Sequence, residues 1–222
     1  MRKIQFANDQ YYHVFNRGVD KRKVFTDSKE YERFILSLIL MNDEKDGMMI
    51  KWRNYKDSHP SSSLDKFLKL SFSERRRLVE IIAYCCNPNH FHFILKQVSE
   101  KGIEKFMHRL STGYTKYFND KHHRSGSLFQ GTFKATHINR DGLLLYLVVY
   151  VNCNSEIHGV AKAKNYRWCS FPCYLKKGRN DIVNKSIILE EFNNLHSFKE
   201  FSVSHIRHFE ERKADEKIFI ES

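Results

Sequence analysis

The sequence is poor in the residues that make turns and contains no long apolar run. It has 9 glycines and 3 prolines among 222 residues, and a many-turned β-sandwich or barrel would need more of both. The longest apolar run, Leu143 to Val151, is far shorter than the roughly 18 residues that span a bilayer. No charged stretch followed by an apolar one opens the chain, as it would in a secretory signal. We therefore expect a soluble, cytoplasmic protein with no membrane partner.

The cysteines do not form a pattern typical of disulfides or zinc sites. They are five in number, and no two of them are separated by two residues (Cys85, Cys86, Cys153, Cys169 and Cys173). An odd number without paired spacing argues against both a disulfide framework and a zinc ribbon. We expect free thiols in a cytosolic protein.

The charge is strongly positive and unevenly distributed. Thirty-eight Lys and Arg against 26 Asp and Glu leave a net charge of +12. Residues 1–180 hold 32 basic and 17 acidic side chains (+15), and residues 181–222 hold 6 and 9 (−3). A region this basic suits a polyanion, and nucleic acid is the commonest one. A basic surface that only confers solubility is the alternative.

The hydrophobic pattern predicts an α+β fold. We expect an antiparallel or mixed sheet with helices packed mainly on one face. Residues 42–75 are polar and irregular, and we expect an insertion or a long loop there. The predicted strands are 11–16, 78–86, 91–95 and 128–138, with Gly131 as a bulge in the last; the predicted helices are 28–39, with Ser28 as its cap, 103–119 and 186–200. We divide the chain into a domain at 1–180, which contains the insertion, and a helical extension at 181–222.

Two histidines flank a phenylalanine in a predicted strand. Side chains two residues apart on a strand share a face, so His90 and His92 would converge on one side while Phe91 points to the other. Two imidazoles placed in this way can bind one metal ion. The alternative is a pair of half-exposed strand histidines, because twelve histidines in 222 residues make such a spacing common by chance.

The apolar segment from Gly142 to Asn154 fits either a strand or a helix on its pattern alone. If it is a helix, Tyr146, Tyr150 and Asn154 share one face at four-residue intervals. A tyrosine hydroxyl has a pKa near 10, so it becomes a useful nucleophile where a cation or a base favours the phenolate. The alternative is that both tyrosines are core aromatics with hydrogen-bonded hydroxyls.

Taken together, several segments resemble the REP-associated tyrosine transposases, relatives of the small single-tyrosine (HUH) insertion-sequence transposases. The resemblance runs from about Tyr12 to Tyr174 and is interrupted by the insertion. The segments are YHVFNRG, IIAYCCNPNHFHFIL, FMHRLSTGYTKYFNDKHHRSGSLFQGTFKA, YVNCNSEIHG and YRWCSF. The HHRSGSLFQGTFKA stretch and the Tyr-x3-Asn-x4-Gly spacing, in this order, are the most specific of them.

The resemblance implies a ferredoxin-like sheet with the histidine pair on a central strand, and it makes the ambiguous segment a helix. It also implies that Tyr150 is the nucleophile, that His90 and His92 bind a metal ion, and that Asn154 is a third ligand. Tyr146, one turn earlier, is the second choice of nucleophile. The chain departs from the family in having Ser155 where proline is usual, and Glu156 and Ile157 where a basic residue is usual.

From these residues we predict a transposase that cleaves and rejoins single-stranded DNA near hairpins, with Mg²⁺ or Mn²⁺ as its cofactor. Arg124, Lys134, Arg140 and Lys162 are our candidates for phosphate contacts, although each is also explained as ordinary surface charge. A hairpin-binding protein that no longer cuts DNA is the second hypothesis, and an RNA-binding ferredoxin-like module is the third. Self-association as a homodimer is left open.

Overall fold

The computed structural model describes residues 4–71, 75–139, 141–175 and 182–214. Its centre is a four-stranded antiparallel sheet in the order β2-β3-β1-β4. The strands are β1 (Tyr11–Arg17), β2 (Val79–Asn87), β3 (His90–Gln97) and β4 (Lys134–Ile138). They follow the predicted strand–helix–strand–strand–helix–strand sequence of elements, so the expected ferredoxin-like α+β fold is confirmed.

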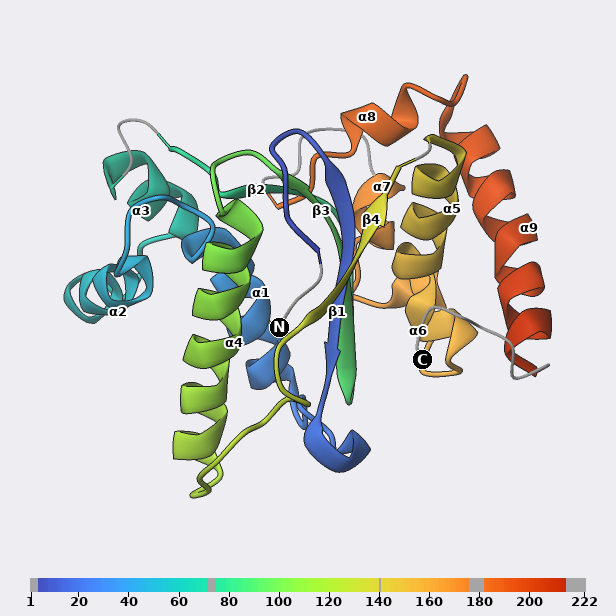
Figure 1. Cartoon of the computed structure of the whole chain (residues 1–222). Coiled ribbons are helices and arrows are strands. Elements are labelled where there is room, and N and C mark those ends of the chain that lie inside the picture. Colours follow the sequence, from blue (N-terminus) through green and yellow to red (C-terminus); the bar gives the residue numbers. More distant parts are fainter. Residues whose placement is uncertain (1–3, 72–74, 140, 176–181, 215–222) are drawn as a thin grey trace.

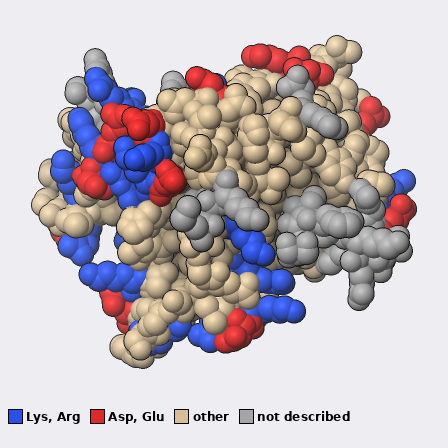
Figure 2. Space-filling model, viewed as in Figure 1, with Lys and Arg blue, Asp and Glu red and all other residues tan. Residues whose placement is uncertain are grey.

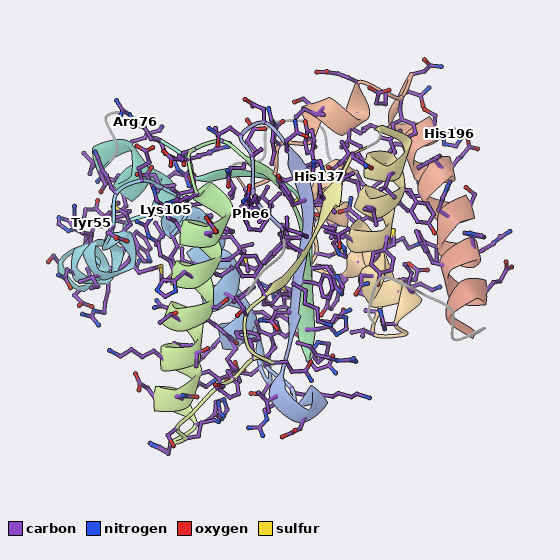
Figure 3. The ribbon with its side chains drawn as sticks, viewed as in Figure 1. Phe6, Tyr55, Arg76, Lys105, His137 and His196 are labelled. Carbon is purple, nitrogen blue, oxygen red and sulfur yellow. The ribbon has the colours of Figure 1, made fainter. Side chains whose placement is uncertain are left out.

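Helices cover both faces of the sheet, not mainly one as predicted (Figure 1). On one face lie α1 (Ser28–Leu40) and α4 (Gly102–Lys121), and on the other lie α5 (Asp141–Asn152), α6 (Asn154–Ile157) and α9 (Leu195–Ala214). The reason is that β3 is buried on both sides: Phe91 and Phe93 contact Phe34 of α1, whereas His92 faces Tyr150 of α5. Side chains fill both interfaces between sheet and helices (Figure 3).

The ambiguous apolar segment is helical, as the family resemblance implied, but α5 ends at Asn152 and Asn154 begins the short α6. Its β-branched and aromatic residues favour a strand locally, but tertiary packing decides in favour of the helix. α5 contacts the sheet on one side and α9 on the other. A helix that is buried on most sides is apolar nearly all round, and this removes the amphipathic pattern that identifies surface helices.

The predicted insertion is helical rather than irregular. It contains α2 (Met48–Ser58) and α3 (Leu64–Ser71), which share a small second core made by Leu40, Met48, Met49 and Phe67. Three of these residues lie in the polar stretch itself, which is a weak sequence signal, and the two helices form because the three pack against Leu40 at the end of α1.

Three further boundaries differ from the prediction. The cap of α1 is Asp27, whose carboxylate accepts the Glu30 N–H, and not Ser28. β4 begins only at Lys134, and Gly131 lies in the preceding loop with a φ of 72°. The last predicted helix is divided into α8 (Ser186–Leu189) and the longer α9.

The remaining short elements are η1 (Val19–Lys21), η2 (Ala163–Asn165) and α7 (Phe171–Tyr174). The predicted domain boundary at residue 180 lies outside the described residues. All five cysteines are free thiols, as expected. Among the described residues, no helix is both long and apolar enough to cross a membrane.

On the face seen in Figure 2, Lys and Arg gather over α2 and α3 and toward the lower end of the molecule, and few lie over α5 and β4.

Candidate functional site

The histidine pair lies on β3, one of the two central strands, and faces α5 and α6. In the register of the sheet, His92 lies between Cys85 of β2 and Phe15 of β1, and His90 lies between Asn87 and Arg17. Since residues directly opposite one another in a sheet point to the same face, these neighbours surround the pair. His90 is 6% and His92 1% exposed, so the site is nearly closed.

The hydrogen bonds of His90 fix its tautomer. Its Nδ1 lies 2.6 Å from the side-chain oxygen of Asn89, which can only accept, so Nδ1 carries the proton. Nε2 therefore offers a lone pair. It lies 3.1 Å from Oδ1 of Asn154 and 3.1 Å from the amide nitrogen of Asn87. That amide also donates to Oδ1 of Asn154 over 2.6 Å. The side-chain N–H₂ group of Asn87 thus contacts both Nε2 of His90 and Oδ1 of Asn154.

This arrangement of acceptors fits a divalent cation. Two ligands that bind one ion at right angles, with bonds of about 2.1 Å, lie about 3.0 Å apart. The separation of 3.1 Å between Nε2 of His90 and Oδ1 of Asn154 matches this. Among the described residues, no group of three or more His, Cys, Asp and Glu side chains could hold a metal ion, so the candidate set is two imidazoles and one amide oxygen.

The second imidazole is held by a third histidine. Nδ1 of His92 lies 2.9 Å from Nε2 of His13 on β1, and the two rings are stacked with an interplanar angle of 10°. This contact uses Nδ1 of His92, so Nε2 would be the nitrogen that binds an ion. Nearby, burial raises the pKa of the Cys85 thiol well above its ordinary value. Burial therefore favours the neutral thiol at Cys85.

The structure brings Tyr150, rather than Tyr146, to the histidines. The Tyr150 ring meets His92 edge to face at 5.7 Å and His13 at 6.1 Å. The Tyr146 ring points to α9 instead, where it contacts Phe209 at 4.5 Å. Phe209 also covers Tyr150 at 5.2 Å, and Tyr150 is 1% exposed.

The predicted phosphate contacts lie in different surroundings. Lys134 lines the same pocket as the histidine pair. Arg124 is bonded to Asn119 and Ser127 in the loop after α4, and Lys162 forms an ion pair with Glu156. Arg140 lies outside the described residues. Of the three candidates that the structure describes, Lys134 is the one that lies at the histidines.

Sequence reasoning missed His13, Asn87 and Arg17 as members of this site. The alternation of the strand containing His13 was visible, but pairing partners and register depend on the assembled sheet. Asn87 lies just beyond the predicted strand 78–86, although it is the last residue of β2 and pairs with His90.

Comparison with known proteins bears on this site. Residues 52–154, a little under half of the chain, match a family model described as "Transposase IS200 like". A search of curated proteins found no match. A solved structure of a REP-associated tyrosine transposase bound to a REP hairpin aligns with 13% identity and a TM-score of 0.49, covering 84% of this chain and 94% of that one. The matched segment contains His90, His92, Tyr150 and Asn154, so the family match agrees with the resemblance inferred from the motifs.

Proposed function

We propose that the chain is a metal-dependent transposase and endonuclease that cleaves and rejoins single-stranded DNA near hairpins. The observation that carries the proposal is the meeting of Tyr150 with His92, in a site where His90 and Asn154 aim two acceptor atoms at one point. A family match to transposases over the same segment supports it.

His90, His92 and Asn154 would hold the ion, Mg²⁺ or Mn²⁺. Nitrogen ligands favour Mn²⁺, and cellular abundance favours Mg²⁺. When bound, such an ion polarises the phosphate oxygens and stabilises a nearby phenolate. His13 and Asn89 orient the two imidazoles through their second nitrogens, as the outer partners of metal-binding histidines do.

Tyr150 is the proposed nucleophile. Its hydroxyl oxygen forms a bond to phosphorus, and the bond between phosphorus and the 3′ oxygen breaks. The phenol proton passes to solvent, and the released 3′ oxygen takes up a proton. The product is a 5′-phosphotyrosine link and a free 3′-hydroxyl. Because the link is itself a phosphodiester, rejoining is the reverse reaction and needs no ATP.

A hairpin-DNA-binding protein without cleavage activity is the second candidate. The burial of Tyr150 beneath Phe209 favours it, because a nucleophile that is 1% exposed must be uncovered before it can react.

The test separates the two candidates. Labelled hairpin DNA with single-stranded flanks, taken from the genomic neighbourhood of the coding sequence, is incubated with the protein and Mn²⁺ or Mg²⁺, and a covalent adduct is sought on a denaturing gel. We expect an adduct that is lost with Tyr150→Phe and with chelator, and is kept with Tyr146→Phe. An adduct that needs Tyr146 instead would overturn the assignment of the nucleophile. Tight binding without any adduct would favour the second candidate.

A further inference from the structure

A small pocket adjoins the histidine pair on the β1 side. It has a volume of about 60 Å³ and lies between β1, β3 and the segment that leads into β4. Its walls carry two cations beside the imidazoles, one from β1 and one from β4. The lining includes Phe15, Arg17, His90, His92, Gln130 and Lys134.

Arg17 has an unused donor at this pocket. Its Nε is shielded from solvent and has no hydrogen-bond partner among the described residues. A buried donor on a charged group that lacks a partner is costly, and such groups commonly mark the place of a ligand or an ion. In the sheet Arg17 lies directly opposite His90. The missing acceptor would therefore lie beside the imidazole.

Lys134 supplies the second positive charge. Its ammonium group lies 5.9 Å from the centre of the Phe15 ring, and it makes no ion pair with a described acidic residue. By contrast, Lys121 and Lys162 are both paired with carboxylates. Within the part of the chain that the structure describes, neither cation at this pocket has an acidic partner, and the positive charge that this leaves suits an anion.

We infer that this pocket binds one phosphodiester group of the DNA strand, with Nε of Arg17 donating to a non-bridging oxygen and Lys134 supplying charge. On this measure a single water needs about 10–15 Å³, so a pocket of about 60 Å³ has room for a phosphate group. Phe15, stacked on His92 at 5.4 Å, forms an apolar wall. The inference deepens the proposed function and rests on it for the identity of the anion as DNA phosphate.

The role expected of Arg17 is to bind the phosphate on the side away from Asn154. Asn154 approaches His90 from α6, whereas Arg17 and Lys134 belong to β1 and β4. A guanidinium group can donate two parallel hydrogen bonds to phosphate oxygens, and a lysine ammonium cannot reproduce that geometry. Arg17→Lys keeps the positive charge but loses the planar guanidinium group, and Arg17→Gln loses the charge as well. Comparison of the two variants therefore separates the effect of shape from the effect of charge.

A binding test needs no cleavage. The dinucleotide d(TpT), which carries one phosphodiester, is titrated into ¹⁵N-labelled full-length protein with Mg²⁺, and the arginine Nε–Hε signals are followed by NMR. The Arg17 signal is assigned from its loss in Arg17→Lys. We expect this signal to shift saturably, while that of Arg109, whose Nε is paired with Asp46, stays in place. We also expect Arg17→Gln to weaken d(TpT) binding at least tenfold. An unmoved Arg17 signal, or an unchanged affinity in Arg17→Gln, would overturn the inference.

The adduct assay supplies a second readout. We expect Arg17→Gln to lower kcat for adduct formation by about 10²- to 10³-fold, as the loss of one transition-state donor does, with only partial recovery in Arg17→Lys. Affinity for Mn²⁺ should stay within twofold of wild type, because Arg17 is not a metal ligand. Full activity in Arg17→Gln would contradict the inference. If the wild-type protein forms no adduct but its Arg17 signal shifts, the proposed function fails while the phosphate pocket stands.

Discussion

Nε2 of His13 lies 2.9 Å from Nδ1 of His92, and the two rings are nearly parallel. The pair joins the two central strands β1 and β3 in a region where His13 and His92 are both 1% exposed. A contact of this kind orients the second imidazole and selects the nitrogen that faces the site.

The first prediction concerns this contact. We expect His13→Phe, which keeps an aromatic ring on β1, to weaken Mn²⁺ binding by about 10- to 100-fold, the usual effect of losing an outer partner of a metal ligand. Isothermal titration calorimetry measures the affinity. His137→Phe is the matched control, because His137 lies on β4 and contacts Gln10 at the surface. Equal affinities in His13→Phe and wild type would show that the contact does not position His92 for an ion.

A second prediction concerns metal and stability. An ion that binds only the folded chain stabilises it by about 2.7 kcal/mol at a concentration of one hundred times its Kd. We therefore expect Mn²⁺ to raise the Tm of the wild type saturably and excess chelator to reverse the shift. His90→Ala should abolish the shift, because it removes the imidazole nitrogen that faces Asn154. His196→Ala on the outer surface of α9 is the control (Figure 3). A full shift in His90→Ala would place the ion elsewhere.

A third prediction concerns pH. The Glu30 carboxylate on α1 is fully buried and bonds to Lys121 and His122 near the end of α4 and to the backbone of Thr26. Burial acts to raise the pKa of Glu30, but the hydrogen bonds from Lys121, Thr26 and His122 outweigh it and hold the pKa below its ordinary value of 4.5. The ionised group therefore contributes stability that is fully present above about pH 4.5 and is lost as the pH falls through the folded-state pKa.

Urea unfolding from pH 7 to pH 3 checks this prediction for Glu30. We expect Glu30→Gln to be less stable than wild type at pH 7, and the difference in free energy of unfolding to shrink as the solution is acidified. Glu32→Gln is the control, because the ion pair of Glu32 with Arg167 is exposed at the surface. A Glu30→Gln difference that stayed constant over the whole pH range would exclude the carboxylate as its source.

The sheet could be predicted from the sequence because its strands carry strong local signals. The histidine pair is an example: the alternation around Phe91 correctly placed His90 and His92 on one face. The helix α5, which covers that face of the sheet, could not be predicted in the same way. α5 is apolar on nearly every side, so its pattern does not distinguish a buried helix from a strand.

The site residues that could not be identified from the sequence share one physical reason. His13, Arg17 and Asn87 reach the histidines across strand pairs, and each pairing joins residues that are far apart in the chain or lie across a turn. Nothing in the local sequence of β1 fixes which strand it will pair with. Tyr150 on α5 and Asn154 on α6, in contrast, are four residues apart in two helices that follow one another directly, so local structure brings them close.

The last prediction concerns the cover over Tyr150. Phe209 of α9 is 1% exposed and contacts both Tyr150 and Tyr146. Removal of a buried phenylalanine ring costs about 3–5 kcal/mol, and here the loss falls on the contact between α5 and α9. We expect Phe209→Ala to lower stability by that amount in urea unfolding and to speed hydrogen exchange in both helices. Val203→Ala, which changes an exposed residue of α9, should do neither. Because the ring covers the proposed nucleophile, we also expect a higher initial rate of adduct formation per folded molecule. Faster exchange in α5 with an unchanged adduct rate would show that DNA reaches Tyr150 without displacing α9.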